Sequence, residues 1–192
     1  MTIDDLESKL EGGAETQTFE VKGPCTCDIK SLAKDILAMS NVQGGGNIAI
    51  GIEDDSFVRH GVTALQKATY KIDEMKDQMA PYADPHVNFR LESLIDDENK
   101  EYIIITVLPF EEIPVICRKD GHDIKAGTIY HRNRSGRVQS ARVSNSYDMR
   151  DIITNAAVKM MHRLNQAGLH VGEIPNVAVI TKKKLDDELK GL

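Results

Sequence analysis

The chain has 192 residues, of which 41% are hydrophobic and 28% are charged, and its formal net charge is −6 at pH 7. This length and composition predict one globular domain with its own core, and the charge excludes a protein that coats nucleic acid by charge alone. The longest apolar runs are far shorter than a membrane span and the N-terminus lacks the pattern of a signal peptide, so we expect a cytoplasmic protein without a membrane partner.

Helical and alternating hydrophobic periods divide the chain into elements that are separated by glycine, proline and polar turns. In chain order they predict a helix at 3–10, a strand at 16–22, a helix at 29–41, a strand at 48–52, a helix at 64–79, strands at 87–95, 102–109, 115–118 and 128–132, and a closing helix at 147–164. The polar residues 96–100 join two of these strands into a hairpin.

One stretch, residues 39–55, organises the rest, because it combines a helix end, three glycines, an alternating strand and three consecutive acids. Ala49 and Gly51 leave one face of that strand nearly bare, so a helix or a ligand backbone must approach it closely, and we favour the helix. Glu53, Asp54 and Asp55 repel one another at the strand end unless solvent, a cation or a basic partner relieves the repulsion.

The three cysteines are odd in number, which argues against a disulfide framework and agrees with a reducing compartment. Cys25 and Cys27 are separated by one residue and have no second pair, so we do not expect a zinc site.

Charge is distributed unevenly along the chain. Residues 1–22 carry six acids and two lysines, whereas residues 113–142 carry two acids and seven cations, namely Arg118, Lys119, Lys125, Arg132, Arg134, Arg137 and Arg142. The two segments either pair with each other at the surface or form a cationic track for a phosphate backbone beside an acidic pocket. In the second case we expect phosphate contacts from Lys125, Arg132, Arg134 and Arg137.

Five segments, in order between residues 14 and 153, are similar to a known family: Glu15-Thr-Gln-Thr-Phe19-Glu20-Val-Lys22, Ala38-Met39-Ser40-Asn41, Gly44-Gly45, Ile50-Gly51-Ile52-Glu53-Asp54-Asp55 and Tyr130-His-Arg132-Asn-Arg134-Ser135-Gly136. Together they resemble the AlbA_2 domain of the Schlafen family. The resemblance implies nucleic-acid handling and an α+β fold with a mixed or antiparallel sheet of about five or six strands packed with helices. We assign this domain to residues 1–167 and a C-terminal tail to residues 168–192.

The resemblance also implies cleavage of structured RNA by three carboxylates. By position these fall on Glu15, Glu20 and Asp54, with Asp55 as the alternative to Asp54, and the family's lysine falls on Lys22. Carboxylates are the ligands that Mg²⁺ and Mn²⁺ prefer, so we expect a metal-dependent endoribonuclease acting on structured RNA such as tRNA. Glu15 is at an odd separation from Glu20, so it joins the others only from a bend or bulge ahead of the strand.

Two other functions compete with this one. The first is a non-catalytic nucleic-acid-binding module of the transcriptional-regulator type, in which arginines hold the nucleic acid and acids cap turns. The second, ATP binding, is less favoured, because Gly44-x-Gly46-x-x-Ala49 follows a helix and precedes a strand, the reverse of a phosphate-binding turn.

The resemblance bears on assembly as well. The Schlafen cleft is made by two related lobes, whereas this chain has residues for one, so a second lobe would come from a homodimer. The closing helix or the tail supplies apolar residues for such a dimer, or the same residues complete the core of a monomer.

Overall fold

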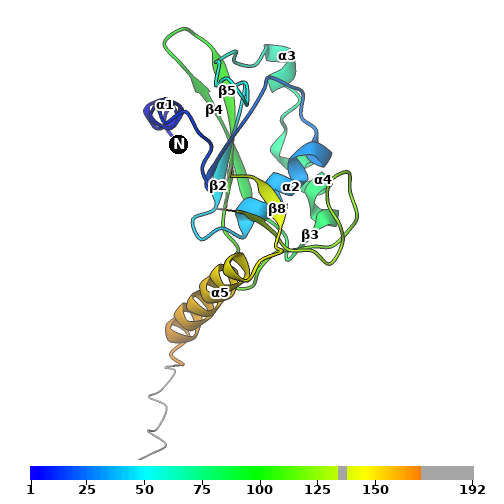
Figure 1. The fold of residues 1–192 in the computed structure, drawn as a ribbon. Helices are drawn as coiled ribbons and strands as arrows, with labels where there is room; N and C mark the ends of the chain where they lie inside the picture. The colour runs from blue at the N-terminus through cyan, green and yellow to red at the C-terminus, as the bar shows by residue number, and fades with distance from the viewer. Residues whose placement is uncertain (134–137, 170–192) are drawn as a thin grey trace, which may run out of the picture.

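The computed structural model describes residues 1–133 and 138–169 (Figure 1). Its central sheet is built from β1 (Phe19–Lys22), β2 (Gly46–Ile50), β4 (Phe89–Ile95) and β5 (Glu101–Val107). The strands lie in the order β1-β2-β5-β4, with β1 and β2 parallel and the other neighbours antiparallel. Because helices pack on this mixed sheet, the predicted α+β class is confirmed.

The central sheet has four strands rather than the predicted five or six, because four short strands pair away from it. These are β3 (Ala83–Asp84) with β6 (Ile116–Cys117), and β7 (Tyr130–Arg132) with β8 (Ser140–Arg142). The strands expected at 115–118 and 128–132 therefore exist, but in two separate two-stranded sheets.

The helix expected at 64–79 is divided in two. It consists of α3 (Ala64–Lys67) and α4 (Ile72–Met79), and a short 3-10 helix, η1 (Ala80–Tyr82), follows. Between the two helices the side chain of Tyr70 is buried in the core, and Thr69 Oγ1 donates to the carbonyl oxygen of Gln66. With these contacts, α3 ends at Lys67, although the apolar period of the sequence continues to residue 79.

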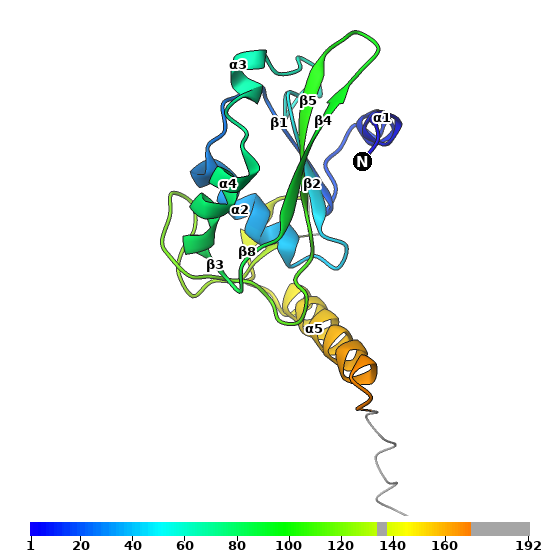
Figure 2. The same ribbon diagram turned by 180° about the vertical axis from the view of Figure 1, so that it is seen from behind.

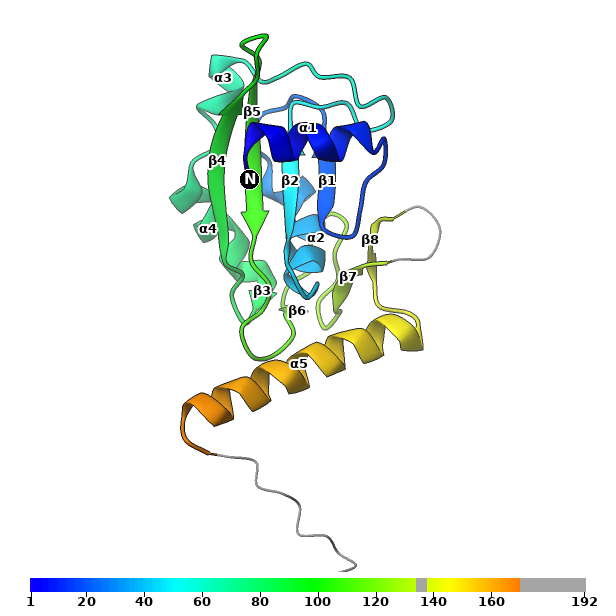
Figure 3. The ribbon, with the colours of Figure 1, turned by 90° about the vertical axis from the view of Figure 1, so that its left-hand side faces the viewer.

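Helices cover both faces of the sheet (Figures 2 and 3). α1 (Ile3–Glu11) crosses one face, and α2 (Ile29–Ser40) and α4 lie on the other. Since successive strand residues point to opposite faces, Phe19 and Val21 pack toward α1 while Glu20 and Lys22 point toward α2. The core on the α1 side consists of Leu6, Leu10, Phe19, Val21, Ala49, Ile52, Tyr102 and Ile104.

The bare face of β2 is covered as expected at Ala49, which packs in the core beneath α1. Gly51, with a φ of +109°, lies against backbone instead: a Cβ there would be 3.0 Å from the carbonyl carbon of Gly61. The preceding turn needs glycine for the same reason, because Gly45 has a φ of +70° and a Cβ there would lie 2.2 Å from the carbonyl oxygen of Val107. The glycines therefore permit close backbone packing.

Asn41 joins the end of α2 to the segments that carry β6 and β7. It is fully buried, its Nδ2 lies 2.9 Å from the carbonyl oxygens of both Val115 and Tyr130, and its Oδ1 accepts from the Val115 amide at 2.8 Å. This network fixes β7 beside α2.

The last described helix, α5 (Ser146–Gln166), extends away from the sheet rather than closing the fold (Figures 1 and 3). It buries Asp148, Ile152 and Asn155, whereas Ile153 and Met160 are 57% and 49% exposed. No helix among residues 1–133 and 138–169 has the length and apolar character needed to cross a membrane. All but two residues of the expected tail, 170–192, lie outside the described residues.

Candidate functional site

Glu15 immediately precedes a tight bend at the start of β1. The Thr16 amide donates to the carbonyl oxygen of Phe19 at 3.0 Å, and the Phe19 amide donates to that of Thr16 at 3.2 Å. The bend brings the Glu15 side chain back along the strand, where its Oε1 accepts from the Val21 amide at 3.1 Å. The bend that the odd separation from Glu20 required is therefore present.

A hollow of about 340 Å³ opens beside Glu15. One side comes from the loop after α1 and the other from the acidic turn after β2, so residues far apart in the sequence meet there. We call this the acidic hollow; it is lined by Gly13, Ala14, Glu15, Asp54, Asp55, Phe57 and Val138. Asp54 and Asp55 both line it, and both remain candidates for the third carboxylate.

The Glu15 carboxyl is in an unfavourable environment for its charge. Burial and the nearby Glu20 carboxylate, with a smaller contribution from Asp54, raise the pKa of Glu15 to about 7 against the opposing effects of the Val21 amide and Arg132. Its side chain is 9% exposed, and the closest Arg132 nitrogen is 3.9 Å away. The three carboxylates therefore lie near enough to influence one another electrostatically.

Glu20 is also buried, but cations surround it. Its Oε1 lies 3.3 Å from Lys22 Nζ, and its Oε2 accepts a hydrogen bond from Arg132 Nη1. Lys22 Nζ in turn lies 2.8 Å from Asp35 Oδ2 on α2. Although burial disfavours its charge, the carboxylates of Asp35 and Glu20 raise the pKa of Lys22 above its usual value. Lys22 is thus held inside an ion-pair network.

The structure separates the residues expected to contact phosphates. Arg132 is fully buried, so its guanidinium contacts carboxylates and backbone instead of the surface. Lys125 is exposed and its ammonium lies 3.3 Å from Asp120 Oδ2. Arg134 and Arg137 lie outside the described residues. Of the four residues expected to contact phosphates, only Lys125 is both described and exposed to solvent.

Sequence reasoning missed the roles of Asp35 and Arg132. A signal for Asp35 was present: it falls on α2 between the buried Leu32 and Ile36, where an acid needs a buried cation as a partner. Arg132 gave no comparable signal, because it lies in a segment rich in exposed cations. Its burial depends on the pairing of β7 with β8 and on the packing of β7 against α2.

A metal ion fits this arrangement only in part. Among the described residues, no group of three His, Cys, Asp or Glu side chains is arranged to hold one. Glu15 and Asp54 line the same hollow and offer the hard oxygen donors that suit Mg²⁺ or Mn²⁺. Glu20 is instead bonded to Lys22 and Arg132. Of the three predicted ligands, Glu15 and Asp54 therefore lie together in the hollow and Glu20 does not line it.

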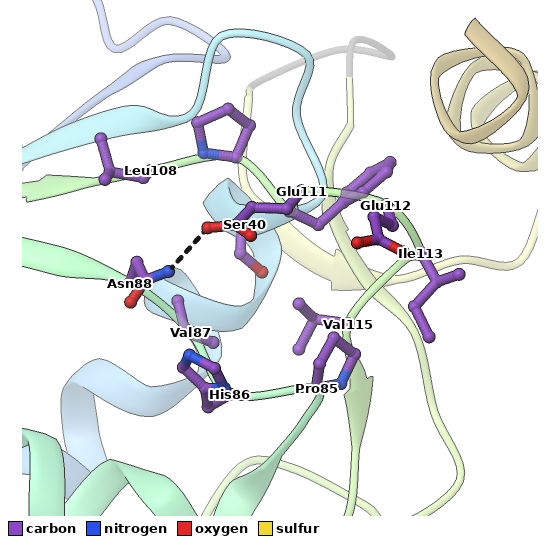
Figure 4. Close-up of a pocket in the computed structure, with 12 residues that line it drawn as sticks. Ser40, Pro85, His86, Val87, Asn88, Leu108, Glu111, Glu112, Ile113 and Val115 are labelled. Atoms are coloured by element: carbon purple, nitrogen blue, oxygen red, sulfur yellow. Dashed lines mark hydrogen bonds between the residues drawn. The ribbon is translucent and has the colours of Figure 1, made fainter. Parts of the chain in front are cut away.

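A second cavity, of about 240 Å³, lies where β4 begins and β5 ends (Figure 4). Its walls are largely apolar and include Val87, Leu108 and Val115, and Asn88 Nδ2 donates to Glu111 Oε1 at its edge, at 3.3 Å. It contains none of the predicted site residues, and its volume is below the range usual for ligand sites.

The structure therefore combines a mixed sheet, helices on both of its faces and an acidic hollow, which is the architecture of an α+β domain. The sequence model of the family "Schlafen, AlbA_2" matches residues 15–141, so the chain belongs to the Schlafen AlbA_2 family. This membership confirms the predicted resemblance and suggests a nucleic-acid-related function.

Other comparisons add little to this assignment. A search of curated proteins finds no match. The crystal structure of the DIP2311 protein from Corynebacterium diphtheriae is similar at 16% sequence identity with a TM-score of 0.47. The match covers 71% of this chain and 24% of that chain, so this chain spans about a quarter of the length of that protein.

Proposed function

We propose that this protein is a cytoplasmic, Mg²⁺- or Mn²⁺-dependent endoribonuclease that acts on structured RNA such as tRNA, with the acidic hollow as its reaction centre. The observation that carries the proposal is the environment of Glu15. Burial and, after it, the nearby carboxylates of Glu20 and Asp54 raise the pKa of the Glu15 carboxyl to about 7, and a divalent cation bound between Glu15 and Asp54 in the hollow would offset the repulsive part of this effect. Membership of the Schlafen AlbA_2 family supports the choice of nucleic acid as substrate.

The residues of the site have separate roles in this proposal. Glu15 and Asp54 would hold the ion, with Asp55 as a further ligand from the same hollow. When bound, the ion supplies positive charge to a phosphate whose negative charge increases during cleavage. Glu20 and Lys22 stay in their internal ion pairs and do not line the hollow.

RNA binding would use cations outside the hollow. Lys125 is the described candidate, and we propose that Arg134 and Arg137 add further phosphate contacts. Such contacts give affinity that is independent of sequence and dependent on salt. We favour RNA over DNA because the resemblance points to structured RNA.

We also propose that a homodimer forms the full RNA-binding surface. α5 supports this proposal, because it extends from the domain with Ile153, Met160 and Met161 each about half exposed. A second copy would cover such an apolar face. Light scattering of the full chain and of a M160E variant tests it, with a dimer expected for the first and a monomer for the second; a monomeric full chain at micromolar concentration would contradict it.

The second candidate function is a nucleic-acid-binding module without catalysis. A specific observation favours it: Glu20 and Lys22, two residues expected to act in catalysis, already bond to each other and to Arg132 and Asp35. In this case the acidic residues stabilise the fold and only the cations act on nucleic acid.

One experiment separates the two functions. The purified protein is incubated with tRNA, ribosomal RNA, single-stranded DNA and duplex DNA, with Mg²⁺ or Mn²⁺ and then with EDTA. The proposal predicts cleavage of the structured RNAs, at specific positions, that EDTA abolishes. Binding of the same RNAs without cleavage under either metal would contradict the nuclease and leave the binding module as the function.

A further inference from the structure

Arg132 contacts the two carbonyl groups that close the bend ahead of β1. Its Nη2 donates to the carbonyl oxygen of Thr16 at 3.0 Å and to that of Phe19 at 3.2 Å. The same two oxygens accept the amide hydrogens of Phe19 and Thr16. One guanidinium nitrogen therefore bridges both hydrogen bonds that define the bend.

A second contact ties the bend to β7. Gln17, at the centre of the bend, donates from Nε2 to the carbonyl oxygen of Arg132 at 3.0 Å. The main chain and the side chain of Arg132 thus both hold residues 16–19. Glu15 precedes this segment directly and bonds to Val21 beyond it, so opening the bend would move the Glu15 carboxylate out of the hollow.

These contacts decide among three roles for Arg132: a phosphate ligand, a counter-charge for Glu20, or a residue that positions the bend. A phosphate ligand must reach the surface, but Arg132 is fully buried. A cation needed only to balance the charge of Glu20 has no reason to bond to backbone carbonyls, and a lysine would serve as well. Bonding to two carbonyls, the Glu20 carboxylate and Ser140 Oγ at once requires the planar fork of an arginine.

We propose that Arg132 is a positioning residue: its guanidinium fork, together with the hydrogen bond from Gln17 to its main-chain carbonyl, holds the bend at residues 16–19 so that Glu15 points into the acidic hollow. The inference rests on the proposed function only in taking that hollow as the reaction centre. The geometric part, that Arg132 holds the bend, is independent of any activity.

The test is amide hydrogen exchange in R132K, which keeps the charge but loses the fork. The expected result is exchange at least about tenfold faster at Thr16, Phe19 and Val21, with unchanged protection in β5 and at Ile48 and Ile50 of β2. R142K is the matched control, because Arg142 is exposed on the neighbouring strand β8 and should alter none of these amides. Unchanged exchange at the three amides in R132K would overturn the proposal.

A second variant covers the case in which R132K fails to fold and loses protection in β2 and β5 as well. Q17A removes the other tether and leaves the buried charges in place. The expected result is exchange about threefold faster at Thr16 and Phe19. Exchange equal to that of the wild-type protein in Q17A would overturn the proposal.

RNA cleavage by R132K then separates this inference from the proposed function. A positioning residue predicts a lower kcat with unchanged KM and an unchanged salt dependence of RNA binding, because Arg132 touches no substrate. A raised KM with a flatter salt dependence would instead identify a phosphate ligand and overturn the inference. If the wild-type protein cleaves no RNA, the proposed function fails, and the exchange rates of R132K and Q17A still decide the role of Arg132.

Discussion

Glu15 and Glu20 are equally buried, with side chains 9% and 10% exposed, yet their surroundings differ. Glu20 bonds to both Lys22 and Arg132, whereas Glu15 has one backbone amide at 3.1 Å and an arginine nitrogen at 3.9 Å. Two carboxyls of equal burial are therefore held differently: Glu20 is ion-paired with two cations, whereas the hydrogen bond that Glu15 accepts comes from the backbone. We call Glu20, Lys22, Asp35 and Arg132 the paired group, and Glu15, Asp54 and Asp55 the hollow group.

The largest expected effect is on stability, from breaking the paired group. E20Q leaves the buried Arg132 without its carboxylate, and we expect a loss of about 3–5 kcal/mol in the free energy of unfolding. Urea denaturation measures it. E7Q is the control, since Glu7 pairs with Arg59 at the surface, where such a pair contributes less than about 1 kcal/mol. If E20Q loses no more free energy of unfolding than E7Q, the distinction between the paired group and the hollow group is wrong.

Substitutions in the hollow group should lower the rate of RNA cleavage and leave the free energy of unfolding nearly unchanged. D54N removes a proposed ion ligand from an exposed turn, so we expect RNA cleavage to fall at least about a hundredfold, or about 2.7 kcal/mol. The free energy of unfolding should change by less than about 0.5 kcal/mol. D97N, in the exposed β4–β5 turn, is the control and should cleave normally. Full activity in D54N would move the reaction centre elsewhere.

The pH dependence of stability sharpens the comparison. The pKa of Glu15 is raised from 4.5 to about 7 in the folded protein, so its favourable contribution is complete below pH 4.5 and is lost as the pH rises through 7. Relative to E15Q, which cannot ionise, the wild-type protein should lose about 2 kcal/mol between pH 5 and pH 8. Urea denaturation of both proteins across this range measures the difference. Parallel curves would mean that Glu15 ionises as readily as an exposed carboxyl.

The smallest expected effect concerns an exposed cation. K125Q should weaken RNA binding equally for all sequences and reduce the slope of log affinity against log salt concentration by about 1. K71Q is the matched control, because Lys71 is also exposed and paired with an acid, Glu74. An identical salt slope in wild-type and K125Q proteins would place the RNA-binding surface away from Lys125.

Local patterns were sufficient to predict most of the fold. α1, α2 and the β4–β5 hairpin follow from their apolar periods, because each element buries one face against the core. The pairing of the short strands did not follow. It depends on contacts between distant segments, such as those of Asn41 with Val115 and Tyr130, which no local period records.

The positions of some proposed site residues in the fold also followed from local sequence, and others did not. The odd separation of Glu15 and Glu20 required a bend, and the structure has one at residues 16–19. The exposure of the arginines could not be inferred, because the sequence places Arg132 among surface cations and only the packing of β7 shows that it is buried. The packing of β7, and not the sequence of the segment 130–136, determines that Glu20 pairs with Arg132.

The most direct test of the account is whether a divalent ion binds in the acidic hollow. Mn²⁺ is paramagnetic, so titrating it into the labelled protein broadens the amide signals of residues near its site. We predict selective broadening at residues 13–15 and 54–57 in the wild-type protein, weaker broadening in D54N and normal broadening in D97N. Broadening elsewhere, or broadening of these residues that is the same in D54N, would contradict the assignment of the hollow as the reaction centre.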